Sequence, residues 1–134
     1  MSRIRGKNTG PEVFVRRVLH RNGFRFRLHD KTLSGSPDIV LLKYETVIFI
    51  HGCFWHHHSR CARASLPRTN RAFWEKKIFG NVVRDRRDKR RLTRQGWRVL
   101  TIWQCETRNL TDLEGRLVTA LREAKRLKAR LSTN

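Results

Sequence analysis

Residues 38–50 read DIVLLKYETVIFI, in which two short apolar runs flank three more polar residues. Each run has the length and the β-branched content of a buried strand, and the residues between them predict a tight hairpin. With the turn placed at Tyr44, antiparallel pairing sets Asp38 opposite Ile50, with His51 next to it. The sequence therefore predicts a carboxylate and an imidazole together at the open end of a hairpin.

This pair admits two interpretations. Asp38 could hold a divalent cation while a basic group lies beside it, as a hydrolytic metal site requires. Alternatively, Asp38 only caps a strand at a loop junction, and His51 is an ordinary edge residue. The two residues alone leave both interpretations open.

Apolar spacing and turn residues predict the elements on both sides of the hairpin. Helices are expected at Glu12–Asn22, Asn70–Gln95 and Thr111–Leu131, and further strands at Phe24–Leu28 and Trp97–Trp103. The order helix, three strands, loop, helix, strand, helix predicts an α/β fold, a mixed sheet flanked by helices. At 134 residues the chain is expected to form a single domain, 1–134, which ends in a helical segment at 107–134.

The charge of the chain points to its partner. Lys and Arg number 31 against 11 Asp and Glu, which gives a net charge of +20 and a pI near 11.7. A compact domain with this charge repels itself, and a polyanion relieves that repulsion. Nucleic acid is the expected partner, bound through counterion release at its phosphates.

The sequence also bears on location. No apolar run approaches the ~18 residues that a membrane helix needs. The first seven residues have the charge of a signal peptide without its apolar segment. We therefore expect a protein of the cytoplasm that makes no contact with a membrane.

The loop at residues 52–61 concentrates soft metal ligands. It holds two thiols, three imidazoles and two large aromatic side chains, and the third cysteine of the chain follows the last predicted strand. An odd cysteine count without a secretion signal argues against a disulfide framework. Three cysteines and one histidine form a standard tetrahedral zinc set. The candidate ligands are Cys53, Cys61, Cys105 and His58, with His57 as the alternative imidazole; free thiols in a polar loop are the other interpretation.

The chain contains three sequence motifs, Val47–His56, Asn81–Asp88 and Gly96–Leu100, with Pro37-Asp38, Phe73-Trp74 and the segment Arg3–Glu12 in register. Together they resemble the motifs of the very-short-patch repair (Vsr) family of DNA mismatch endonucleases. The resemblance covers nearly the whole chain up to Glu106. The layout around Pro37-Asp38 also resembles the PD-(D/E)XK superfamily, which implies a restriction-endonuclease-like fold. In place of that superfamily's second acid and lysine, however, this chain has Phe49-Ile50-His51.

The resemblance implies roles for the residues of a catalytic site. Asp38 is the expected carboxylate ligand of Mg²⁺, and the main-chain carbonyl of Ile50 is a second oxygen ligand. His51 and His56 are the expected catalytic imidazoles, of which His56 is better placed to activate water. Two further residues complete the set: Asp85 orients His56, and Glu12 contacts metal-bound water. Without the resemblance, both would be ordinary helix carboxylates.

The resemblance also implies a DNA interface. Phe54, Trp55 and Trp74 are the expected wedge in the base stack beside a mispaired step. Trp97 and Trp103 are expected to pack in the core. The remaining expected contacts are Met1, Ile4 and Lys7 on an N-terminal arm, residues 1–11, and Arg84 and Arg87, which bind phosphates on a basic helix.

The function implied is hydrolysis of a phosphodiester 5′ to the thymine of a T·G mismatch, formed where 5-methylcytosine has deaminated. The enzyme would initiate very-short-patch repair as a monomer in the bacterial cytoplasm, at the nucleoid, with catalytic Mg²⁺ and structural Zn²⁺. Other mismatch-repair proteins are candidate partners. Two alternatives from other classes are a non-catalytic, zinc-stabilised nucleic-acid-binding module and a nuclease of the His-metal finger type, which would not need Asp38.

Overall fold

A four-stranded mixed sheet with the strand order β1-β2-β3-β4 forms the centre of the computed structural model. The structure describes residues 10–132, except for the side chains of Leu110 and of residues 127–132. The expected DNA contacts Met1, Ile4 and Lys7 lie outside these residues. The strands are β1 (Arg27–Leu28), β2 (Ile39–Leu41), β3 (Thr46–His51) and β4 (Arg98–Trp103), and the helices are α1 (Gly10–Arg21), α2 (Arg71–Arg94) and α3 (Leu110–Ser132).

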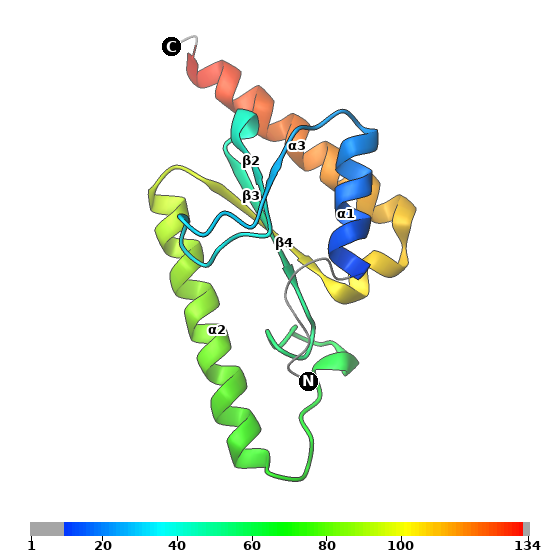
Figure 1. Cartoon of the computed structure of the whole chain (residues 1–134), viewed down its shortest axis with the longest axis vertical. Coiled ribbons are helices and arrows are strands. Elements are labelled where there is room, and N and C mark those ends of the chain that lie inside the picture. Colours follow the sequence, from blue (N-terminus) through cyan, green and yellow to red (C-terminus); the bar gives the residue numbers. More distant parts are fainter. Residues whose placement is uncertain (1–9, 133–134) are drawn as a thin grey trace.

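The predicted order of elements and the mixed α/β architecture are confirmed. β1, β2 and β3 are antiparallel neighbours, whereas β4 runs parallel to β3 after the long crossover through α2. Figure 1 shows α2 on one side of the sheet and α1 with α3 on the other. No helix within residues 10–132 is both long and apolar enough to cross a membrane.

The alternation of β3 supplies apolar side chains to both faces of the sheet. Ile48 packs in a core with α1 and α3, together with Leu19 and Leu117. Val47 packs in a smaller core on the other face, where Leu92 of α2 is fully buried. Because both faces are covered, the strands carry continuous apolar runs.

The predicted register of the hairpin is wrong by one residue. Ile39 pairs with Ile48 and Leu41 pairs with Thr46, so Asp38 comes opposite Phe49 and not opposite Ile50. The reason lies in the turn: Leu42 leaves the strand, is half exposed, and begins a 3₁₀ turn at Leu42–Tyr44. Glu45 closes that turn in the left-handed conformation, with φ of 50°.

The first predicted strand is also too long. Only Arg27 and Leu28 of Phe24–Leu28 pair with β2. Phe24 instead packs into the core and makes an edge-to-face contact with Tyr44, with ring centroids 5.3 Å apart. The helix boundaries differ from those predicted by no more than two residues, and a 3₁₀ segment (Gln104–Arg108) precedes α3.

Candidate active site

Three residues from three elements form a carboxylate cluster at the edge of the sheet. Glu12 lies in the first turn of α1, His29 follows β1 and Asp38 precedes β2, and their ligand atoms lie within 4.8 Å of one another. The main-chain N–H of His29 donates to the Asp38 carbonyl at 3.0 Å, which extends the β1–β2 pairing by one residue. The cluster could hold a divalent cation through its carboxylate oxygens.

The Asp38 side chain lies beside Ile50 in spite of the register. Its Oδ2 accepts a hydrogen bond from the Ile50 N–H at 2.7 Å. Burial raises the pKa of Asp38 to about 6, against that hydrogen bond, and the charge of Glu12 raises it further. At neutral pH an ionised Asp38 is therefore held at a free-energy cost, which a bound cation would offset.

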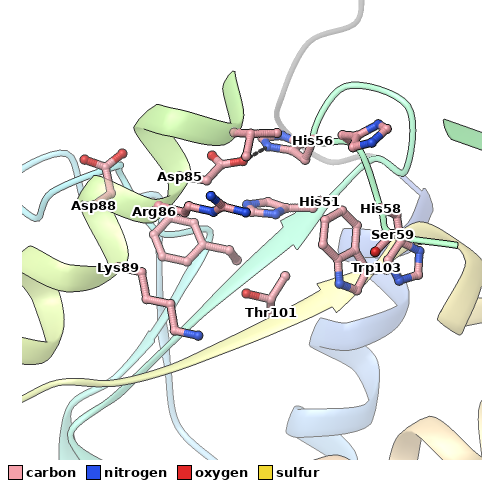
Figure 2. Close-up of a pocket in the computed structure, with 13 residues that line it drawn as sticks. His51, His56, His58, Ser59, Asp85, Arg86, Asp88, Lys89, Thr101 and Trp103 are labelled. Carbon is pink, nitrogen blue, oxygen red and sulfur yellow. Dashed lines mark hydrogen bonds and ion pairs between the residues drawn. The ribbon is translucent and has the colours of Figure 1, made fainter. Parts of the chain in front are cut away.

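Two stacked imidazoles lie next to this carboxylate cluster. The ring centroids of His51 and His56 are 3.8 Å apart, and the two rings are nearly parallel. His56 Nδ1 contacts Asp85 Oδ2 of α2 at 2.7 Å, as Figure 2 shows. Burial, followed by the neighbouring His56, lowers the pKa of His51 to about 4. At neutral pH His51 is therefore uncharged.

The imidazole pair forms one wall of a cavity of about 500 Å³ between the sheet and α2. Arg86 and Lys89 of α2 lie on the cavity wall, and Thr101 and Trp103 of β4 lie opposite them (Figure 2). In this cavity an imidazole can accept a proton while the neighbouring cationic side chains bind a phosphate.

A third cluster joins the loop after β3 to the segment after β4. Cys53, His58, Cys61 and Cys105 bring their ligand atoms within 4.8 Å of one another, and all three cysteines are free thiols. His58 Nδ1 lies 3.4 Å from Cys105 Sγ, whereas His57 is exposed and is not part of the cluster. Of the two candidate histidines, the geometry thus favours His58.

The chemistry of this thiol cluster fits a cation. Burial, followed by the neighbouring Cys53, raises the pKa of Cys105 to about 11. Three thiolates this close repel one another unless a cation lies between them. One imidazole and three thiolates match the donor set that zinc takes in closed, four-coordinate sites.

Aromatic side chains gather where the loop after β3 meets the beginning of α2. Phe54 lies 5.1 Å from Trp55 and 5.5 Å from Trp74, centroid to centroid. Trp55 is 37% exposed and Phe73 is 58% exposed. The Asn81 side chain donates to the Trp55 carbonyl at 2.9 Å and so joins the loop to α2. This partly exposed cluster could stack on nucleic-acid bases.

The two predicted phosphate contacts lie on α2. Both Arg84 and Arg87 are exposed. Arg84 donates to the Asn81 side chain, and Arg87 lies 3.7 Å from Asp88. Their exposure leaves both guanidinium groups open to a polyanion.

The structure adds two residues that sequence reasoning missed. His29 joins Glu12 and Asp38, although nothing in its own sequence context suggests a ligand. Trp103, expected in the core, is half-buried and lies between two imidazoles: it stacks on His58 at 4.2 Å and meets His51 edge-on at 5.2 Å. Trp97, in contrast, packs against the smaller core as expected.

Known proteins share this sequence over most of its length. The family model described as DNA mismatch endonuclease Vsr matches residues 1–63. The type II nicking enzyme V.XorIIP of Xanthomonas oryzae pv. oryzae is 49% identical over 117 residues, which cover 87% of this chain and 85% of that enzyme. V.NmeAIP of Neisseria meningitidis, also a type II nicking enzyme, is 46% identical over 93% of this chain and 89% of its own. The DNA mismatch endonuclease Vsr of Escherichia coli K12 is 44% identical over 89% of this chain and 76% of its own.

Proposed function

Because the chain belongs to the Vsr family of DNA mismatch endonucleases, we propose that it nicks duplex DNA on the 5′ side of the thymine in a T·G mismatch. It is a DNA endonuclease, as its relatives are. The relatives are named as nicking enzymes or as a mismatch endonuclease, which supports both parts of the proposal. These names also weigh against the alternative of a non-catalytic binding module.

The observation that carries the proposal is the adjacency of the carboxylate cluster and the imidazole pair. The Ile50 N–H is bonded to Asp38, and the next residue, His51, stacks on His56. A cation ligand and a proton acceptor therefore stand side by side, as metal-assisted hydrolysis of a phosphodiester requires.

We assign the proton transfer to His56. Its contact with Asp85 fixes the ring and its tautomer, so that the other ring nitrogen can take a proton from the attacking water. The water oxygen then bonds to phosphorus as the bond to the leaving oxygen breaks. His51 is uncharged and stacked on His56, so it holds that ring in place without adding positive charge of its own.

Asp38, with the Ile50 main-chain carbonyl, would hold Mg²⁺, and buried Glu12 would contact its water ligands. When bound, Mg²⁺ supplies positive charge that stabilises the transition state and the leaving oxygen.

We propose that the aromatic cluster recognises the mismatch. Phe54, Trp55 and Trp74 could enter the base stack at the mispaired step, which is the least costly to open. Arg84 and Arg87 would bind phosphates, together with Lys7 of the N-terminal arm, while Met1 and Ile4 enter the groove. The net charge of +20 supports strong and salt-dependent binding to DNA.

We assign structural Zn²⁺ to Cys53, His58, Cys61 and Cys105. Four protein ligands leave no open position for substrate, so this ion would join the catalytic loop to the segment after β4. The wider proposal is a monomer of the bacterial cytoplasm with a restriction-endonuclease-like fold. It would begin very-short-patch repair at deaminated 5-methylcytosine, alongside other mismatch-repair proteins.

The test compares cleavage of two duplexes that differ only in one T·G pair, with and without Mg²⁺. We expect a single nick on the thymine strand of the mismatched duplex, loss of nicking in Asp38→Asn, and full activity in the control Asp112→Asn, an exposed carboxylate of α3. Equal cutting of the paired duplex would refute the specificity. An active Asp38→Asn enzyme would instead favour a His-metal finger mechanism.

A further inference from the structure

We propose that His29 is a direct nitrogen ligand of the active-site cation, and that the site therefore binds Mn²⁺ more tightly than Mg²⁺. This inference rests on the proposed function, because it concerns the cation held by Asp38. It adds an imidazole to a site for which the sequence predicted only oxygen ligands, and it concerns which metal the enzyme selects.

Main-chain and side-chain contacts place His29 beside both carboxylates. The hydrogen bond from the His29 N–H to the Asp38 carbonyl fixes the two main chains side by side. The ring of His29 reaches α1, where its Nε2 lies 2.7 Å from Glu12 Oε2. The imidazole nitrogen and the two carboxylates thus approach one common point from three different elements.

The ring nitrogen of His29 that faces Glu12 makes no aligned hydrogen bond. The His29 side chain is 20% exposed, its Nε2 is buried, and this atom has no hydrogen-bond partner among the described residues. The short distance to Glu12 therefore does not come with a well-aligned N–H···O bond. A buried ring nitrogen that meets a carboxylate without an aligned hydrogen bond calls for an explanation. A lone pair directed at the cation held by Asp38, with Glu12 beside its water ligands, provides one.

The backbone at His29 adopts an uncommon conformation. His29 has φ of 49°, in the left-handed region that few residues other than glycine adopt, although asparagine, aspartate and histidine are enriched there. Such conformations persist where the surrounding structure demands them, and they cluster at functional sites. Here the unfavourable turn directs the imidazole toward Glu12 and not out to solvent.

The consequence for metal choice follows from ligand chemistry. Carboxylate, carbonyl and water oxygens suit Mg²⁺ and Mn²⁺ alike, whereas imidazole binds first-row transition metals in preference to Mg²⁺. One nitrogen among oxygen ligands therefore raises the affinity for Mn²⁺ while adding little for Mg²⁺.

The experiment measures binding of Mn²⁺ alone, without DNA, to the full chain saturated with one equivalent of zinc. Free Mn²⁺ is quantified by electron paramagnetic resonance, and the affinity for Mg²⁺ is measured by its competition with Mn²⁺. Electron spin-echo modulation detects a ¹⁴N nucleus coordinated to the bound Mn²⁺. The variant is His29→Asn, because asparagine tolerates the left-handed backbone. His57→Asn is the matched control, since His57 is exposed and has φ of 51°.

We expect ¹⁴N modulation and at least roughly tenfold tighter binding of Mn²⁺ than of Mg²⁺ in the wild type and in His57→Asn. In His29→Asn the modulation should disappear and Mn²⁺ binding should weaken roughly tenfold, the lower end for losing a group that supports a metal site, with Mg²⁺ binding nearly unchanged. Nitrogen coupling that persists in His29→Asn, equal weakening for both cations, or Mn²⁺ binding that survives Asp38→Asn would each overturn the proposal. Because this experiment contains no DNA, its outcome does not depend on whether the enzyme nicks a T·G duplex. A failure of this inference can therefore be told apart from a failure of the proposed function.

Discussion

Replacing Asp38 by asparagine should stabilise the protein in magnesium-free buffer while it abolishes nicking. The pKa of Asp38 is raised from 3.8 to about 6, chiefly by burial. At ~1.4 kcal/mol for each pH unit, the ionised carboxylate costs the folded state up to ~3 kcal/mol at pH 7. Asparagine removes that charge and keeps an oxygen that can accept the Ile50 N–H. We expect a gain of roughly 1–3 kcal/mol.

The contribution of Asp38 to the free energy of unfolding depends on pH. The folded state binds the Asp38 proton more tightly than the unfolded state does, so the wild type gains stability as the pH falls through about 6 towards 3.8. His51 acts in the opposite direction, because its pKa is lowered from 6.5 to about 4 and its contribution is lost as the pH falls through that range. The two contributions nearly cancel in the wild type. Asp38→Asn leaves only the loss due to His51, so its advantage should vanish near pH 4.

The assay is urea unfolding between pH 4 and 7.5, with one equivalent of zinc and no chelator, so that the thiol cluster is unchanged. Adding Mg²⁺ at about 100 times its dissociation constant should stabilise the wild type by ~2.7 kcal/mol and leave Asp38→Asn unaffected. Asp112→Asn should follow the wild type throughout. A variant no more stable than the wild type at pH 7 without Mg²⁺, with the same dependence on urea, would refute the idea that the carboxylate is held at a cost.

Three further results are expected. Asp85→Asn should lower the single-turnover nicking rate roughly 10–100-fold with little change in DNA affinity, because it frees the His56 ring; a change in affinity alone would contradict this role. Trp74→Ala should weaken binding to a T·G duplex by ~1–3 kcal/mol in fluorescence anisotropy, and weaken binding to a paired duplex less; equal losses would show that the ring only packs against Phe54. Cys61→Ser should lose bound zinc, measured by mass spectrometry, and melt at a lower temperature; zinc retained at one equivalent would exclude Cys61 as a ligand.

Local patterns were enough to predict the elements, but not how they meet. The two apolar runs of the hairpin predicted β2 and β3, because burial on both faces gives continuous apolar strands. The predicted register was wrong because Leu42 was counted as a strand residue, as its apolar side chain suggests. In the structure Leu42 is half exposed and begins a 3₁₀ turn. Asp38 nevertheless meets Ile50, because the contact runs from its side chain to the next main-chain N–H and not across the pair.

The sites show the same limit. The thiol cluster could be predicted from residue types, because one odd cysteine after a strand needs partners and the loop supplies them. The place of His29 in the carboxylate cluster could not be predicted. It depends on how the first turn of α1 packs against the end of β1, and on a left-handed backbone that no neighbouring residue indicates. Trp103 looked like any aromatic residue on a buried strand, and only the parallel pairing of His51 with Trp103 brings it beside the imidazoles.

The end of β3 links all three clusters, and this has a consequence for zinc. The Ile50 N–H is bonded to Asp38, His51 belongs to the imidazole pair, and Cys53 belongs to the thiol cluster. Trp103 makes a second link, because it stacks on His58 and meets His51 edge-on. Losing the proposed zinc ion would release His58 and with it one face of Trp103, which in turn supports the ring of His51. Zinc removal should therefore slow nicking at temperatures where the protein is still fully folded, and a loss of activity that only follows unfolding would show that the two centres are independent.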